Sequence, residues 1–343
     1  MDAMVDSLAE TERVTGEPRV VFPEVVKEDL KQGILRVNRI IETFRPQAIA
    51  VLKRSGDLAF FALKEFEGDR LDGVEEVSIL IGREISDRFD TSGFGTSELS
   101  LDDGAERLRE VIPVYRRYLS GDDSLQFTEE GVERVDVGAI TARAKTELIE
   151  TLGETARGGN LKRLLIVDDA PSSGITIGLT APIIVMEALD EMGLSSRLRG
   201  DAAEQRTAEV VNELMGDSDP DVEIRTACLM ENFWHDRVLA ASFPDLVGNG
   251  VSGMMMREWL KEVVMKGAWE KPNGELEVID TEEKAEFAVR RISRREVGLG
   301  NADRSSDMVD KWRERYSDPH LEKLLRLHAQ VVEELRSVGR DLL

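Results

Sequence analysis

The stretch that decides the fold is LLIVDDAPSSGITIG, residues 164–178. Four apolar residues lead into two adjacent aspartates, Asp168 and Asp169, and then into a turn of small and hydroxylated residues. A short apolar run bounded by turn residues indicates a buried strand, and an apolar segment with helical spacing continues from Ile175 to Glu191. A strand, a polar turn and a helix in this order are typical of an α/β domain.

The same alternation extends on both sides of this stretch. The apolar patterns predict strands at 47–52, 75–82, 161–169 and 222–230. They predict helices at 23–44, 58–66, 102–119, 139–157, 175–191 and 201–215, with a turn, KRSGD, at 53–57. Strands that alternate with helices favour a doubly wound, mainly parallel sheet that is covered on both faces.

Composition changes along the chain predict three parts. Residues 1–22 read as a mobile N-terminal tail, and residues 23–250 as the α/β domain, with a helical insertion at about 102–157. Residues 251–343 read as a mainly helical C-terminal extension, in which 254–269 is expected to be helical. Its last helix carries one apolar stripe: Leu321, Leu324, Leu325, His328, Val331, Val332, Leu335, Val338 and Leu342. Such a stripe packs either on its own domain or on another subunit, so a homo-oligomer formed through the C-terminal helices is one expectation.

Charge and residue usage exclude several classes of protein. The net charge of −23 repels a phosphate backbone, so no nucleic-acid partner is expected. No apolar stretch approaches the roughly 20 residues that span a bilayer, and the acidic N-terminus lacks the apolar segment of a secretory signal. The single cysteine and the three scattered histidines supply neither a disulfide nor a Cys/His metal site. We expect a cytoplasmic protein without a membrane partner.

The turn after the central strand has the chemistry of a phosphate site. Ligands of doubly wound sheets bind outside the carboxyl ends of the strands, where Asp168 and Asp169 are expected. The turn offers backbone N–H groups, a helix N-terminus and the hydroxyls of Ser172, Ser173 and Thr176 to an anion. Two carboxylates beside a phosphate should face something other than the phosphate, such as sugar hydroxyls or a magnesium ion. A sugar phosphate would satisfy both sets of groups, with its phosphate on the N–H groups and hydroxyls of the turn and its sugar hydroxyls on the two carboxylates.

The segment IVDDAPSSGITI resembles the phosphoribosyl-pyrophosphate (PRPP) signature of the type I phosphoribosyltransferases. That signature has apolar residues, two acids, three variable positions, Thr or Ser, Gly, one further residue, and Thr or Ser. Asp168 and Asp169 match the acids, and Ser173, Gly174 and Thr176 match the later positions. The resemblance implies a sheet of phosphoribosyltransferase type and a loop for the 5-phosphate of PRPP. The residues of this loop would be Ala170, Pro171, Ser172, Ser173, Gly174, Ile175 and Thr176.

Two further segments stand where the resemblance implies them, and it covers roughly residues 23–250. A pyrophosphate loop would follow the first strand, formed by Lys53, Arg54, Ser55 and Gly56, and Arg54 could bind phosphate oxygens with its planar fork. Residues 83–100 have too little apolar content to pack and match a long mobile loop, with Arg83 and Arg88 as phosphate contacts. An ordinary polar turn and a solvated loop are the alternatives for these segments.

The resemblance implies transfer of ribose 5-phosphate from PRPP to a nitrogen acceptor, with release of pyrophosphate and Mg²⁺ as cofactor. Asp168 and Asp169 would be catalytic residues that orient the ribose and hold the metal directly or indirectly, and Arg54 would stabilise the leaving group. The acceptor would be a small molecule, most simply a nucleobase. FPDLVG, residues 243–248, faintly resembles a segment of purine-type members, although Leu246 replaces the usual aromatic residue. A purine is therefore weakly favoured.

Two other functions remain open from the sequence. The first is a catalytically inactive PRPP- or nucleotide-sensing regulatory protein of the same fold. The second is a phosphate-binding or phosphatase-like α/β domain that does not use PRPP. Both acids and the basic KRSG segment are present, which favours catalysis, because a pure sensor needs the leaving-group loop less.

Overall fold

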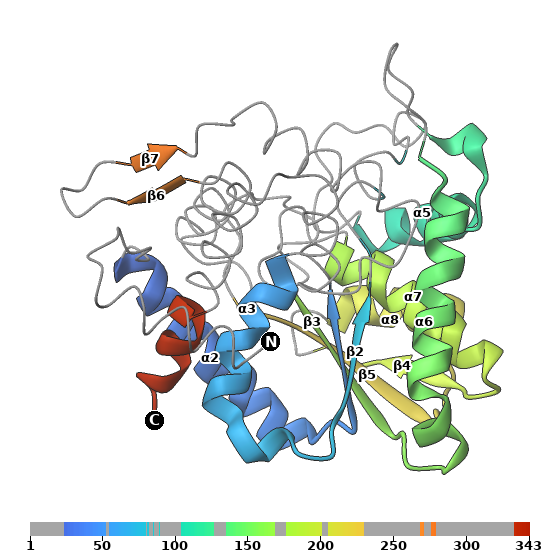
Figure 1. The fold of residues 1–343 in the computed structure, drawn as a ribbon. Helices are drawn as coiled ribbons and strands as arrows, with labels where there is room; N and C mark the ends of the chain where they lie inside the picture. The colour runs from blue at the N-terminus through green and yellow to red at the C-terminus, as the bar shows by residue number, and fades with distance from the viewer. Residues whose placement is uncertain are drawn as a thin grey trace.

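A five-stranded, all-parallel sheet forms the centre of the protein (Figure 1). The computed structural model describes residues 24–52, 55–79, 81, 85, 89, 104–126, 135–168, 176–200, 205–229, 268–270, 276–278 and 333–343. The strand order is β2-β1-β3-β5-β4. The strands are β1 (Ala48–Leu52), β2 (Glu75–Ile79), β3 (Arg163–Asp168), β4 (Ser196–Leu198) and β5 (Val222–Cys228). This confirms the predicted α/β class with a parallel sheet.

The direction of winding reverses between β1 and β3. From β1 the chain passes to β2 on one side, and it then returns across β1 to add β3 on the other side. Val51 pairs with Val167 in the register of these two central strands. At their amino ends the Gln47 side chain accepts hydrogen bonds from the backbone N–H groups of Lys162, at 3.1 Å, and Arg163, at 2.8 Å. The side chain of Gln47 therefore helps to set the β1–β3 register.

One face of the sheet is covered by the helices α2 (Glu24–Phe44) and α3 (Ser55–Glu67). Helix α3 contacts β1 and β3, and α2 contacts α3 and β5. Side chains alternate between the two faces of a strand, so Ile49, Val51 and Val167 share this face and are buried. A short 3₁₀ turn, η1 (Gly68–Leu71), follows α3 and leads to β2.

The opposite face is covered by α5 (Gly104–Leu119), α6 (Val137–Arg157), α7 (Ala181–Glu191) and α8 (Gln205–Met215) (Figure 1). A single apolar core joins these helices to the strand residues whose side chains point to this face of the sheet, among them Ala50, Ile79 and Ile166. Helix α6 contacts β2 directly and is capped at its N-terminus by Asp136, whose carboxylate accepts a hydrogen bond from the Ala139 N–H at 2.8 Å. The two helices expected within 102–157 are thus α5 and α6, with the 3₁₀ turn η3 (Asp123–Leu125) after α5.

The helix expected at 175–191 is described from Thr176 and begins with a wider turn. A π turn, η4 (Thr176–Thr180), precedes α7. Pro182 lies at the start of α7, has no N–H to donate, and would clash with a carbonyl in the preceding turn. A π turn accommodates such a missing donor, and π turns occur frequently at functional sites.

Two parts of the sheet structure were not predicted. The edge strand β4 is only three residues long, too short for a periodic pattern. Asn212 of α8 supports it, since its side-chain amide accepts from the Leu198 N–H at 2.8 Å and donates to the Leu198 carbonyl at 2.7 Å. In addition, β6 (Ala268–Glu270) and β7 (Leu276–Val278) form an antiparallel pair, so the helix expected over 254–269 is wrong at its end. The sequence Asn273-Gly274 between these strands is a hairpin signal.

The C-terminal residues return to the N-terminal helices. Residues 333–340 are helical and lie against α2 and α3 (Figure 1). Leu335 and Val338 of the predicted apolar stripe are fully buried. Lys27 of α2 pairs with Glu334 at 3.5 Å, and Lys31 pairs with Asp341 at 3.1 Å. The described end of the stripe therefore packs within its own chain.

No described helix combines the length and the apolar character that crossing a bilayer requires.

Candidate functional site

The carboxyl ends of β1 and β3 form the centre of the candidate site. Leu52 ends β1, and Asp168 ends the neighbouring strand β3. Asp168 is half-buried and pairs in register with Cys228 of β5, and its carbonyl accepts a hydrogen bond from the Leu229 N–H at 3.0 Å. Asp168 therefore ends a strand with a neighbour on each side, in the middle of the sheet.

The chain leaves these two strand ends toward opposite faces of the sheet. After β1 it enters α3 on the face that also carries α2, and after β3 it enters η4 and α7 on the face that carries α6. In doubly wound sheets, ligands bind at such a switch point, outside the carboxyl ends of the strands. The geometry therefore selects the β1 and β3 ends as the place where a ligand would bind.

The connection after β1 is shorter than predicted. Helix α3 begins at Ser55, so only Lys53 and Arg54 separate it from Leu52. The expected turn at 53–57 is wrong for its last three residues, which belong to the first helical turn. The first N–H groups of a helix have no partner within the helix and carry partial positive charge. Helix α3 thus begins at the same edge of the sheet as Asp168, where these groups favour an anion.

The structure brings part of the predicted site together. It describes Asp168 and Thr176, and it describes the backbone of Ser55 and Gly56 as the first turn of α3. The other predicted site residues lie outside the described residues: Lys53, Arg54, Arg83, Arg88, Asp169, Ala170, Pro171, Ser172, Ser173, Gly174 and Ile175. The purine-like segment 243–248 also lies outside them.

The segment predicted as a mobile loop is anchored near its start. Ile85 is fully buried and Phe89 is 8% exposed, so the expectation that 83–100 cannot pack is wrong for these two residues. Phe89 forms a β-bridge with Gln126 and contacts the rings of Tyr115 and Tyr118 on α5. The sequence did not reveal this burial, because the two tyrosines that pack against the segment lie some thirty residues further along the chain.

A second contact that the sequence reasoning missed lies at the end of β5. Helix α2 passes so close to this end that a Cβ on Gly33 would lie 1.5 Å from the carbonyl oxygen of Leu229. Only glycine permits such an approach of two backbones. The available signal was a glycine inside an otherwise strongly periodic helix. Gly33 thus allows α2 to pack directly against the end of the strand that precedes the expected acceptor segment.

Asp168 is the described residue that fits a metal ion. Its carboxylate supplies the hard oxygen ligands that Mg²⁺ prefers, and Mg²⁺ is commonly bound through one or two carboxylates plus substrate phosphates. Within the described part of the chain, no group of three or more His, Cys, Asp or Glu side chains could hold a metal ion.

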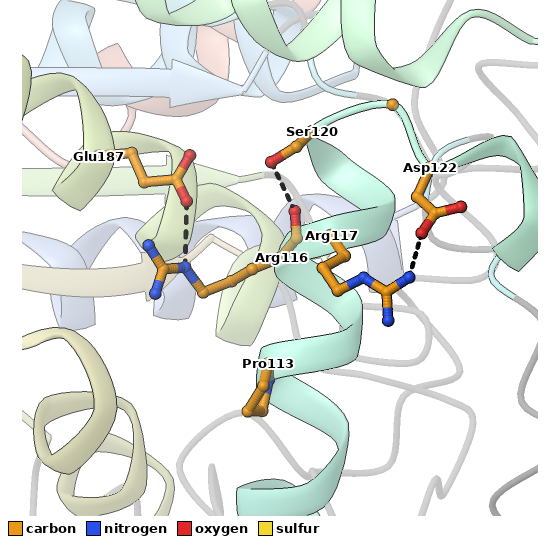
Figure 2. A pocket seen from close by; sticks show the side chains of 7 residues that line it. Pro113, Arg116, Arg117, Ser120, Asp122 and Glu187 are labelled. Atoms are coloured by element: carbon orange, nitrogen blue, oxygen red, sulfur yellow. Dashed lines mark hydrogen bonds and ion pairs between the residues drawn. The ribbon is translucent and has the colours of Figure 1, made fainter.

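A shallow hollow on the outer surface of α5 and α7 contains none of the predicted site residues (Figure 2). Figure 2 shows Arg116 turned toward Glu187, which it binds at 3.1 Å, and Arg117 turned toward Asp122. Because both guanidinium groups are already paired with carboxylates, the hollow lacks an uncompensated cation for a phosphate.

The buried carboxylate of Glu67 lies at the other end of α3 from Ser55. Burial raises the pKa of Glu67, and the nearby Arg70 opposes this effect. With its amide nitrogen turned toward the carboxylate, Asn38 donates to both oxygens of Glu67 at 2.8 and 3.3 Å. This group joins α2 to α3 and is remote along the helix from the candidate site.

Comparison with known proteins found no matching family model, no matching curated protein and no matching solved structure. The fold and the strand ends described above therefore define the class of the protein: an α/β protein with an all-parallel sheet and a switch point between β1 and β3.

Proposed function

We propose that this protein is a phosphoribosyltransferase of the type I class, which transfers ribose 5-phosphate from PRPP to a nitrogen acceptor and releases pyrophosphate. The single observation that carries the proposal is the adjacency of β1 and β3 at the switch point. The basic segment KRSG and the segment DDAPSSGIT begin at the ends of these two strands. The segment DDAPSSGIT was singled out by its residues and KRSG by the resemblance that those residues carry, and the pairing of the strands is a separate observation in support of both.

In this proposal each segment binds a different end of the donor. The turn at 172–176 would bind the 5-phosphate through backbone N–H groups and hydroxyls, and Asp168 and Asp169 would hold the ribose hydroxyls. Lys53 and Arg54, together with the first turn of α3, would bind the pyrophosphate group. As the bond at the anomeric carbon breaks, negative charge grows on the pyrophosphate, and these cationic groups stabilise it most at that point.

Magnesium, when bound with the donor, would supply a positive charge that neutralises the leaving pyrophosphate. The protein's own contribution is then mainly to position the ribose and the acceptor and to keep water away from the anomeric carbon. A small nucleobase, with a purine weakly favoured, is the proposed acceptor. We further propose a cytoplasmic location and a homo-oligomer through the C-terminal helices. Because Leu335 and Val338 pack within their own chain, the contacts of the oligomer would come from the earlier residues of the apolar stripe.

The proposal is tested in two steps with the full-length protein. First, titration calorimetry with PRPP and Mg²⁺ should detect binding, and Asp168→Asn combined with Asp169→Asn should weaken it at least about a hundredfold, as expected for the loss of two charged partners. Asp190→Asn, an exposed aspartate at the C-terminal end of α7, is the matched control and should bind as the unaltered protein does. Unchanged affinity in the double variant would refute the site.

Second, the release of pyrophosphate is assayed with PRPP, Mg²⁺ and a panel of purine and pyrimidine bases. Release that depends on one base supports the transferase. Tight PRPP binding without release for any base would instead support the sensing protein that the sequence left open. Failure to bind PRPP at all would instead favour the third alternative, a phosphate-binding or phosphatase-like α/β domain that does not use PRPP. Arg54→Ala should lower kcat more than the affinity for PRPP, because the charge it neutralises develops during the reaction.

A further inference from the structure

Three buried aromatic rings lie between α5 and the segment that follows β2. Tyr115 and Tyr118, each 1% exposed, stand one turn apart on α5, and Phe89 packs against both. The ring centroids of Phe89 and Tyr115 are 4.8 Å apart in an edge arrangement, and those of the two tyrosines are 5.7 Å apart. The packing of the cluster accounts for the rings but not for the two phenol groups.

Each phenol group forms a buried hydrogen bond to a different segment. The Tyr118 hydroxyl donates to the Ile85 carbonyl at 2.6 Å, within the segment after β2. The hydroxyls of Tyr115 and Thr180 are also 2.6 Å apart, and Thr180 is the last residue of the π turn η4. Helix α5 therefore holds, with two residues of one face, both a segment after β2 and the turn that follows the candidate phosphate loop.

The bond between Tyr115 and Thr180 is more specific than packing requires. A phenylalanine would fill the same space, and a buried hydroxyl costs free energy unless it is hydrogen-bonded. Thr180 stands at the N-cap position of α7, yet its hydroxyl forms no capping bond. That hydroxyl, on a fully buried residue, is bonded to Tyr115 instead.

The turn held in this way starts at the candidate site. It runs from Thr176, the last residue of the proposed phosphate loop, to Thr180, and Ile177, Gly178 and Leu179 between them are buried. A π turn is a rare winding, and Pro182 disfavours the α-helical alternative without fixing where the turn lies, so contacts outside the turn are needed to select its position. A hydrogen bond at its last residue can supply that selection.

We infer that Tyr115 is a positioning residue for Thr176, the described end of the proposed 5-phosphate loop. Through Thr180 it holds the π turn 176–180 in the winding that presents Thr176 to the phosphate. This inference rests on the proposed function, since it concerns the phosphate end of the same donor. Tyr115 touches no substrate in this role and acts through the turn alone.

The test compares Tyr115→Phe with Tyr118→Phe in the full-length protein. Both variants lose one buried phenol of the same cluster, but the phenol of Tyr115 is bonded to Thr180 of the π turn and that of Tyr118 to the Ile85 carbonyl. We use ribose 5-phosphate as the probe because it carries the 5-phosphate and lacks the pyrophosphate group. Tyr115→Phe should weaken its binding about fivefold to tenfold, the factor expected for the loss of one buried hydrogen bond. Tyr118→Phe should leave the affinity for ribose 5-phosphate within about twofold. It should lower the free energy of unfolding about as much as Tyr115→Phe does, because each variant loses one buried hydrogen bond.

Two further variants separate positioning from general damage. Thr180→Ser keeps the hydroxyl and should bind as the unaltered protein does, whereas Thr180→Val should match Tyr115→Phe. Combining Tyr115→Phe with Thr180→Val should weaken binding no further, because both changes remove the same bond. In turnover with PRPP, KM should rise while kcat stays within about twofold, whereas a loss of folded protein would lower kcat at constant KM.

The failure of this inference and the failure of the proposed function give different results. If the unaltered protein binds neither ribose 5-phosphate nor PRPP, the proposed function is wrong and the inference falls with it. If it binds both, and Tyr115→Phe matches Tyr118→Phe in affinity, the inference alone is overturned. Should Thr180→Val fail to fold, normal binding by Thr180→Ser beside weakened binding by Tyr115→Phe still supports the inference, and equal binding by both overturns it.

Discussion

The two faces of the sheet are stabilised in different ways. The helices α5 to α8 share one continuous apolar core, into which the hydroxyls of Tyr115, Tyr118 and Thr180 are built as hydrogen-bonded pairs. The face of α2, α3 and the C-terminal helix combines close backbone contacts at two glycines with ion pairs between segments about three hundred residues apart. The first face therefore bonds α5 to the segment after β2 and to the π turn before α7, and the second joins the two ends of the described chain.

The largest expected effect tests the close contact on the second face. Gly33→Ala would place a Cβ 1.5 Å from the Leu229 carbonyl oxygen, so α2 must move away from β5. Such a shift of packed backbone is expected to cost about 3 kcal/mol of unfolding free energy or more, measured by urea denaturation.

The matched control for Gly33→Ala lies on the other face. Gly153 is a buried glycine of α6, and a Cβ there would meet only the Arg157 guanidinium, at an ordinary 3.6 Å. Gly153→Ala should therefore stabilise the protein by up to about 1 kcal/mol through helix propensity. Equal effects of the two substitutions would contradict the contrast between the faces.

The elements that the sequence predicted correctly are those with local causes. The strands β1 and β3 contain continuous apolar runs, β5 begins with alternating apolar and charged residues, and α2 and α6 show apolar residues at helical spacing. Neighbouring residues alone therefore reveal these elements. The edge strand β4 could not be found in this way, because it depends on β5 and on the side chain of Asn212. The burial of Ile85 and Phe89 likewise depends on tyrosines of another element.

In the candidate site, too, the features with local causes could be predicted from the sequence and those that depend on distant residues could not. The aspartates and the hydroxyl-rich turn form a local pattern, and their place at the end of β3 follows from the apolar run before them. The adjacency of β1 and β3 is a property of the strand order, which a single sequence does not contain. The role inferred for Tyr115 needs a hydrogen bond across sixty-five positions, so no sequence pattern could have indicated it.

A smaller effect is expected where the C-terminal helix meets α3. A Cβ on Gly339 would lie 2.3 Å from the Ala62 carbonyl oxygen, but a terminal helix can move more easily than α2. Gly339→Ala should cost about 1–2 kcal/mol and should speed hydrogen exchange at 333–340 more than in the sheet. Ser337→Ala, in the same helix, is the control and should leave exchange nearly unchanged. Uniformly faster exchange throughout the sheet would show that the helix is not a separate unit.

The pH dependence of stability tests the buried carboxylate between α2 and α3. Because burial raises the pKa of Glu67, its protonated form is favoured in the folded protein. Its contribution is therefore most favourable below the unfolded pKa of about 4.3 and declines as the pH rises through the folded pKa. Glu67→Gln should raise Tm at pH 7 relative to the unaltered protein, and the difference should shrink toward pH 4. A lower Tm at pH 7 would mean that the ion pair with Arg70 outweighs burial.

The smallest effect is expected for the exposed ion pair that holds the last residues of the chain. Lys31 and Asp341 are 3.1 Å apart, and the Asp341 side chain is 55% exposed, so water and salt screen the pair. Asp341→Asn should cost no more than about 0.5 kcal/mol at low salt, and the difference should vanish near 1 M NaCl. The more deeply buried pair of Lys27 with Glu334 is screened less, so Lys27→Met should keep its effect at high salt. Equal salt dependence of the two variants would show that the C-terminal helix is held by its charges as a group, and that Leu335 and Val338 contribute less than their burial suggests.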